Sequence, residues 1–221
     1  MVECLWRIFM RYAIYTLLRW SIESGFYDII MIQKIYINMG ECLMNINYKE
    51  IKYEELFDDM LIYLNRYQYV ENDWYPDKNG GYYLVHQPHE ENWNDERKRE
   101  IVNILRSSIN NGGKLFGAYD QKKLIGFSSI DGMLLGSKSQ YLELTWLHVS
   151  YEYRGNHIGK NLFQLCADAA KQYGCNKIYI VASSSEESQK AYHKLGCVYA
   201  LEHISHLYEK RPDDIHMEYL L

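Results

Sequence analysis

The sequence predicts an α/β protein built around a mixed sheet. Short apolar runs typical of strands alternate along the chain with segments whose apolar residues recur at helical spacing. One stretch, residues 142–173, combines both patterns, because an apolar strand leads through a polar, glycine-bearing turn into a helix. With 221 residues, the chain is long enough for one domain, or for one domain with an extension.

Composition places the chain among ordinary globular proteins. Hydrophobic residues make up 48% of the sequence and charged residues 24%. A formal net charge of −5, with no long run of Lys and Arg, argues against nucleic-acid binding and mildly favours cationic partners such as amines. The five cysteines are widely spaced and form no C-x-x-C pair. They indicate free thiols in a reducing cytosol, so we expect a cytoplasmic protein without a metal site.

Residues 1–43 differ from the rest of the chain. They are apolar and aromatic, but charged residues interrupt every run well short of the roughly 20 residues of a membrane span, so we expect no membrane insertion. Two interpretations stay open for this N-terminal extension. One is an added amphipathic helix or two. The other is a leader that the cell does not normally make, because Gly40-Glu41 can be encoded by a purine-rich, ribosome-binding-like sequence just before Met44. In both, the domain covers residues 44–221.

Within this domain, periodicity and turn residues predict the elements in order. The first part contains a strand at 45–52 and a helix at 54–67. A loop at 68–93, with a short extended piece at 82–86, leads to a second helix at 94–109. The second part contains six strands, at 114–119, 124–130, 141–149, 177–182, 198–203 and 215–220. Its two helices are the one that follows the glycine-bearing turn and a second that Ser183–Ser185 caps and Gly196 ends.

The turn at residues 154–160 has the features of an anion site. Backbone N–H groups are unpaired at a helix N-terminus, the helix dipole favours negative charge, and small residues let a phosphate approach. The turn does not fit the P-loop G-x-x-x-x-G-K-[ST]. Only three residues separate Gly155 from Gly159, and Asn161 stands where a magnesium-binding Ser or Thr belongs. A nucleotide-binding protein therefore stays only as an alternative.

The segment Arg154-Gly155-Asn156-His157-Ile158-Gly159 resembles the pyrophosphate loop Q/R-x-x-G-x-G/A of the GCN5-related N-acetyltransferases, the GNAT superfamily. His157 stands where the first glycine of that motif usually lies. Residues 147–155 resemble the strand that leads into the family's loop, and residues 187–197 resemble its later helix. The order of elements is similar too. The resemblance covers about residues 44–221 and implies a bacterial-type, single-domain member with a central sheet of six to seven strands and helices on both faces.

The resemblance implies acetyl transfer from acetyl-CoA to a primary amine of a small molecule, peptide or protein, by direct attack in a ternary complex. Cofactor binding is expected from amides at the helix start, from the charges of Arg154 and Lys160, from the strand backbone and from a hydroxyl near the later helix. The expected cofactor-binding residues are Leu147, His148, Val149, Arg154, Gly155, Asn156, His157, Ile158, Gly159, Lys160 and Ser185. N-capping explains Ser185 equally well.

Two residues are expected to carry the chemistry. Glu143 matches a strand glutamate that deprotonates the acceptor in histone acetyltransferases of the superfamily, and Tyr192 matches the tyrosine that protonates the coenzyme A thiolate. Strand alternation predicts Glu143 on the same face as Leu147 and Val149, with His148 on the opposite face as a packing or surface histidine. A structural salt bridge is the alternative role for Glu143, and simple packing the alternative for Tyr192.

The acceptor site is expected in the more variable segments, where aromatic rings and carboxylates suit an amine cation. The residues concerned are Trp74, Tyr75, Glu90, Glu91, Trp93 and Asp95. A homodimer is an open possibility. The alternative to an enzyme is a non-catalytic acyl-CoA-binding or regulatory module of the same fold.

Overall fold

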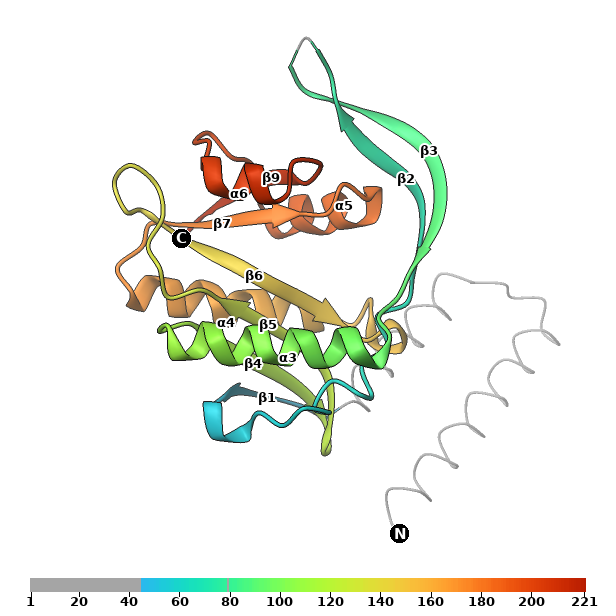
Figure 1. The fold of residues 1–221 in the computed structure, drawn as a ribbon, viewed down its shortest axis with the longest axis vertical. Helices are drawn as coiled ribbons and strands as arrows, with labels where there is room; N and C mark the ends of the chain where they lie inside the picture. The colour runs from blue at the N-terminus through green and yellow to red at the C-terminus, as the bar shows by residue number, and fades with distance from the viewer. Residues whose placement is uncertain (1–44, 79) are drawn as a thin grey trace, which may run out of the picture. The chain divides into compact units, whose positions relative to one another are not determined.

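The computed structural model describes residues 45–78 and 80–221, and the expectations for residues 1–43 lie outside that part of the chain. Its main sheet has seven strands in the order β1-β4-β5-β6-β7-β9-β8 (Figure 1). Their bounds are β1 Ile46–Ile51, β4 Lys114–Asp120, β5 Lys123–Ile130, β6 Tyr141–Val149, β7 Lys177–Ala182, β8 Val198–Tyr199 and β9 Ile215–Leu220. All neighbours are antiparallel except β6 and β7, which are parallel. The predicted mixed α/β sheet is confirmed.

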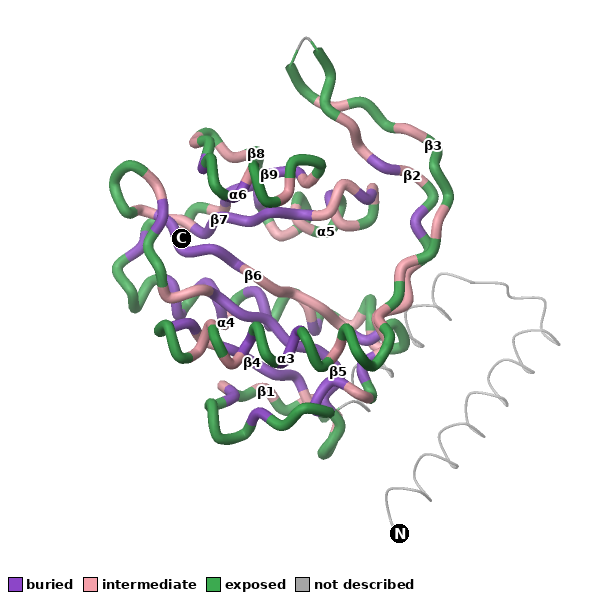
Figure 2. Tube along the Cα trace, viewed as in Figure 1, coloured by how far each residue is buried: buried purple, intermediate pink, exposed green. Residues whose placement is uncertain are grey.

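Helices flank this sheet and define its cores. The bounds are α3 Asp95–Asn110, α4 Ile158–Gln172, α5 Glu186–Leu195 and α6 Ser205–Lys210. The largest cluster of buried side chains joins α4 to alternate residues of β6, β7 and β9, and α5 packs against it. A second cluster joins α3 to β4 and β5, and a third lies under α6. Figure 2 shows burial concentrated along the central strands, as expected for a sheet covered by helices.

The helix α3 shows how local sequence fixes these elements. Asn94 caps its N-terminus, and the side-chain oxygen accepts a hydrogen bond of 2.8 Å from the Arg97 amide. Ile101, Val102 and Leu105 are buried at helical spacing. Among the described residues, no helix is long and apolar enough to cross a membrane.

Two predictions in the first half of the domain were wrong. Residues 54–67 form the 3-10 turn η1 (Tyr53–Glu55) and further turns, not an α-helix, and hydrogen bonds such as Met60 N–H to Phe57 O span only three residues. Leu61 and Leu64 are buried nevertheless, so the spacing of the apolar residues correctly indicated burial but did not indicate a helix. Residues 68–93 are not mainly loop, because they form the hairpin of β2 (Gln68–Pro76) and β3 (Tyr82–Glu91).

The hairpin escaped prediction because most of its side chains are exposed or half-buried, so no apolar alternation marks the strands. Prolines are tolerated in a two-stranded ribbon, where each strand has a free edge.

A third prediction was also wrong. The strand expected at 198–203 ends after Tyr199, and α6 follows. Burial of the apolar side chains of Ile204 and Leu207 stabilises this arrangement in place of further strand pairing.

Two isoleucines on α3 test how much this packing stabilises the fold. Ile101 is 0% exposed and Ile104 is 45% exposed. We expect Ile101→Ala to lower the free energy of unfolding by about 2–5 kcal/mol, because it leaves a cavity in the core. Ile104→Ala should cost less than about 1 kcal/mol. Urea denaturation measures both, and equal losses would contradict the assignment of the α3 face.

Candidate active site

The strands β6 and β7 pair over only part of their length. Their register runs from Tyr141 opposite Lys177 to Leu144 opposite Ile180, and β6 then continues beside β5 alone. Figure 1 shows the two strands running apart towards their C-terminal ends. Half of β6 therefore has one neighbour instead of two.

Hydrogen-bond directions show which peptide groups this divergence leaves open. The Ser150 N–H donates to Ile125 O at 2.8 Å, so Ser150 and His148 direct their peptide groups towards β5. Because directions alternate along a strand, the N–H and C=O groups of Leu147 and Val149 face the side where β7 no longer pairs. We call these groups the open edge of β6. The His148 peptide, expected at that edge, faces β5 instead.

An irregularity in β6 overturns the predicted alternation of its side chains. The register shifts between Ser129–Trp146 and Ile130–Leu144, which inserts one extra residue into β6. Leu144 before the shift and Leu147 after it both pack on the cluster under α4. Glu143 therefore shares a face with His148, and not with Leu147 as predicted.

The turn between β6 and α4 presents unpaired amides. His157 has a left-handed backbone (φ 58°) and directly precedes Ile158, the first residue of α4. The first helical hydrogen bond runs from the Asn161 N–H to His157 O at 3.0 Å. The N–H groups of Ile158, Gly159 and Lys160 thus have no partner within the helix and are available to an anion.

Neighbouring side chains organise the same turn. Arg154 Nε donates to Val149 O at 3.1 Å, and its Nη2 donates to Arg66 O at 3.3 Å, so this guanidinium braces the backbone. Asn156 Nδ2 donates to Tyr153 O and to Arg154 O, both at 3.2 Å. Gly155 is left-handed (φ 81°), and a side chain there would meet open space. The turn is thus shaped by its own hydrogen bonds and leaves room beside the amides.

The Glu143 carboxylate is buried and paired. Arg211, from the turn after α6, donates from Nη2 to Glu143 Oε1 at 2.5 Å. Burial raises the pKa of Glu143, the charge of Arg211 offsets part of this rise, and Asp131 adds to it. The structure thus contains the salt bridge that the sequence analysis gave as the alternative role of Glu143. A proton-accepting role for Glu143 stays a prediction.

Tyr192 packs from α5 against the cluster under α4, where burial raises the pKa of its phenol. Within the described residues, its hydroxyl makes no hydrogen bond, so it can donate to a ligand.

Ser185 caps α5, accepting from the Ser188 amide at 3.4 Å and from Gln68 Nε2 at 3.3 Å. Because Ser185 is only 1% exposed, capping accounts for its hydroxyl, and contact with a cofactor stays a prediction.

Comparison with known proteins identifies the family. A sequence model of the acetyltransferase (GNAT) family matches residues 66–197, which is more than half of the chain. The chain belongs to this family. No curated protein matches the sequence.

Solved structures of similar fold agree with this GNAT assignment. A nourseothricin acetyltransferase is 16% identical with a TM-score of 0.60, over 79% of this chain and 98% of that chain. A protein from Bacillus anthracis str. Ames, assigned as a streptothricin acetyltransferase and crystallised with acetyl coenzyme A, is 17% identical with a TM-score of 0.60, over 80% and 99%. The PaiA N-acetyltransferase of Thermoplasma acidophilum, crystallised with coenzyme A, is 20% identical with a TM-score of 0.51, over 80% and 100%.

The GNAT domain also contains an aromatic cluster around His148. The His148 ring lies 4.6 Å from Trp93, 5.7 Å from Trp146 and 5.8 Å from Phe127, measured between ring centroids. Burial lowers the pKa of His148 well below its ordinary value, and the charges of Arg66 and Arg154 lower it further. The imidazole is therefore neutral near pH 7, which agrees with the packing role predicted for it.

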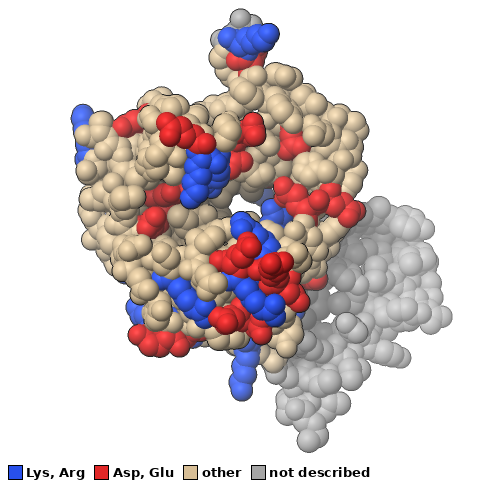
Figure 3. Space-filling model, in the orientation of Figure 1, with Lys and Arg blue, Asp and Glu red and all other residues tan. Residues whose placement is uncertain are grey.

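The hairpin β2–β3 forms a second wall of the site. The Trp74 N–H donates to Ser184 O at 2.9 Å, and Asn72 Nδ2 donates to Glu186 Oε2 at 2.9 Å, which attaches β2 to the start of α5. Figure 3 shows this face of the domain hollowed between the hairpin and the sheet, with acidic and basic side chains on the border. Of the carboxylates expected there, Glu91 accepts from Arg66 Nη2 at 2.9 Å.

Sequence reasoning missed one residue of this region. Asp214, in the turn before β9, is half-buried and close enough to Tyr192 to affect the pKa of that phenol. Burial raises the pKa of Asp214 to about 6; the charge of Arg211 offsets part of the rise, and the charges of Asp213 and Glu91 add to it. The sequence offered only a turn signal at Pro212-Asp213-Asp214, which is no indication of a site.

The Glu143–Arg211 pair predicts a pH-dependent stability. Arg211→Leu leaves Glu143 buried without its partner, so the pKa of Glu143 should rise further. We expect a loss of about 2 kcal/mol near neutral pH, reduced from the value of a fully buried pair because Arg211 is partly exposed. The loss should shrink as pH falls through the raised pKa of Glu143, because a protonated carboxyl needs no counter-charge.

Urea denaturation at neutral and at acidic pH measures this effect. The double variant Glu143→Gln/Arg211→Leu, which has no buried charge left at the pair, should lose the pH dependence. A loss that is the same at both pH values in Arg211→Leu would contradict the prediction.

Proposed function

We propose that this GNAT protein transfers an acetyl group from acetyl-CoA to a primary amine of a small molecule, peptide or protein, by direct attack in a ternary complex. The observation that carries the proposal is the open edge of β6 beside the unpaired amides of α4. An extended pantetheine arm can pair with the peptide groups of Leu147 and the N–H of Val149 while its pyrophosphate binds the amides of Ile158–Lys160. Two proteins of similar fold were crystallised with acetyl coenzyme A or coenzyme A, which supports the same cosubstrate here.

Each chemical requirement of the reaction has a candidate residue. A peptide N–H of the open edge polarises the thioester carbonyl. Glu143, whose pKa is raised by burial, accepts a proton from the amine directly or through a water molecule. The amine nitrogen then bonds to the carbonyl carbon, and the carbon–sulfur bond breaks. The unpartnered hydroxyl of Tyr192 gives its proton to the leaving thiolate.

One observation favours a second candidate function, a non-catalytic acyl-CoA-binding module. The Glu143 carboxylate is already paired with Arg211, so it must leave that pair, or act through water, before it accepts a proton. Cofactor binding would be the same in such a module, and only transfer would be absent. A cytoplasmic location and a homodimer stay predictions.

Cofactor binding is tested with two lysines at opposite ends of α4. If the pyrophosphate lies at the helix start, Lys160→Ala should weaken acetyl-CoA binding about tenfold, the value of one charge-assisted hydrogen bond. The matched control Lys171→Ala, in the last turn of α4, should bind normally. Calorimetry measures both, and ATP should bind wild-type protein more weakly than acetyl-CoA. Equal effects of the two lysines would exclude this placement of the pyrophosphate.

Catalysis is tested with Glu143→Gln and Tyr192→Phe. Both variants should bind acetyl-CoA as wild type does but lower kcat about a hundredfold, because each removes a proton-transfer group. Glu187→Gln and Tyr199→Phe change exposed residues of the same types and should leave kcat unchanged. Transfer to a panel of amines is the measurement. If wild type binds acetyl-CoA but acetylates no amine, the module without catalysis is the better description.

A further inference from the structure

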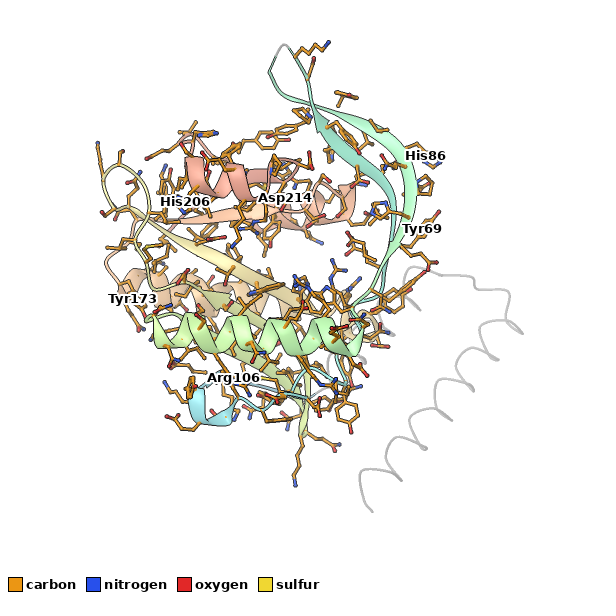
Figure 4. All side chains as sticks on the ribbon, viewed as in Figure 1. Tyr69, His86, Arg106, Tyr173, His206 and Asp214 are labelled. Atoms are coloured by element: carbon orange, nitrogen blue, oxygen red, sulfur yellow. The ribbon has the colours of Figure 1, made fainter. Side chains whose placement is uncertain are left out.

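Asp214 is a carboxylate whose charge the protein compensates only in part, through the nearby charge of Arg211. It lies in the turn that leads into β9, beside α5, and Figure 4 labels it there. Its side chain is half-buried, yet it forms no hydrogen bond or ion pair with any residue in the described part of the chain. Its backbone N–H is bonded, to Arg211 O at 3.4 Å, so the turn itself is held in place.

The charged groups around Asp214 form their ion pairs with other residues. Arg211, the nearest cation in the same turn, donates to Glu143, and its Nε is buried without a partner. From β3, Glu91 is paired with Arg66. From α5, Tyr192 carries no charge near pH 7 because burial raises the pKa of its phenol. The charge of Arg211 thus acts on Asp214 without an ion pair between them, and burial together with Asp213 and Glu91 outweighs it, so that the pKa of Asp214 is raised.

The position of this charge matters as much as its sign. Asp214 affects the pKa of Tyr192, the proposed proton donor, and Glu91 at the end of β3 affects the pKa of Asp214 in turn. Asp214 therefore lies near Tyr192 of α5 and within electrostatic range of Glu91 at the end of the hairpin. A half-buried carboxylate without a bonded partner lacks full hydration and has only a partial counter-charge, so a cationic ligand there gains a stronger interaction than it would at the open surface.

We propose that Asp214 pairs with the ammonium group of the acceptor as it enters the site, so that protonated alkylamines are preferred over neutral amines. The inference rests on the proposed function and adds a residue and a charge requirement to it. Glu143 keeps the proton-accepting role, and Asp214 positions the amine. Alkylammonium groups suit this partner because, like that of lysine, they stay protonated near neutral pH.

The test measures binding, so that it does not depend on turnover. The full-length protein, saturated with coenzyme A, is titrated by NMR with alkylamines from propylamine to octylamine and with the matching neutral alcohols. Asp214→Asn should weaken the best alkylamine about tenfold and leave its alcohol unchanged, since only the charge interaction is lost. Asp213→Asn, which changes an exposed carboxylate next along the chain, should bind both ligands as wild type does.

The pH dependence gives a second readout. Asp214 has a pKa of about 6 and the alkylamine stays charged, so amine affinity for wild type should fall as pH drops from about 7 to about 5. In Asp214→Asn this decline should be absent, and Glu143→Gln should keep it. Arg211, Asp213, Glu91 and Tyr192 are present in all these variants, but Arg211 loses its carboxylate partner in Glu143→Gln, so that variant is compared for the presence of the decline and not for its midpoint.

Three outcomes would overturn the inference. Wild type could bind no alkylamine, Asp214→Asn could bind the best alkylamine as wild type does, or it could lose amine and alcohol equally, which would indicate a structural role. If binding depends on Asp214 but no amine is acetylated, the inference holds and the proposed function fails. Where transfer does occur, Asp214→Asn should raise KM for the amine about tenfold and change kcat less than about threefold. A large fall in kcat would make Asp214 a proton acceptor instead.

Discussion

The site depends on one incomplete ladder of hydrogen bonds. Parallel pairing of β6 with β7 ends at Leu144, and from there the two strands are held by different neighbours, β6 by β5 and β7 by β9. A gap in the middle of a sheet would normally be closed by pairing, because unpaired peptide groups lose hydrogen bonds when buried. Here the peptide groups of Leu147 and the N–H of Val149 have no strand partner, which makes the strand itself a binding surface.

Elements far apart in the sequence stabilise this opening. Arg154 closes one peptide group of the edge by donating to Val149 O, and its other contact joins the same loop to Arg66. On the opposite side, β2 bonds to residues 184–186 at the start of α5 and so holds the hairpin over the diverging strands. The extra residue in β6 then turns Glu143 towards the face that His148 occupies. Strand divergence and side-chain direction are thus separate features that together shape the site.

The carboxylates of the region illustrate how environment divides similar groups into different roles. Glu143 and Glu91 each form an ion pair with an arginine, whereas Asp214 forms none with any residue that the structure describes. Both Glu143 and Asp214 have raised pKa values because of burial, and the charge of Arg211 offsets part of the rise at each, but Arg211 also donates a hydrogen bond to Glu143. A residue type alone therefore says little about function here. The hydrogen-bond and ion-pair partners of each carboxylate determine its role.

The sequence by itself determined the strand–turn–helix unit, the sheet that contains it and the family, because these depend on local periodicity, on glycines and on a contiguous motif from Arg154 to Gly159. Only the tertiary structure decided which groups meet. The hairpin at 68–91 has too few buried side chains to show alternation, and the extra residue in β6 reverses the faces without changing the sequence pattern. The pairing of Glu143 with Arg211 joins positions more than 60 residues apart, where no spacing rule applies.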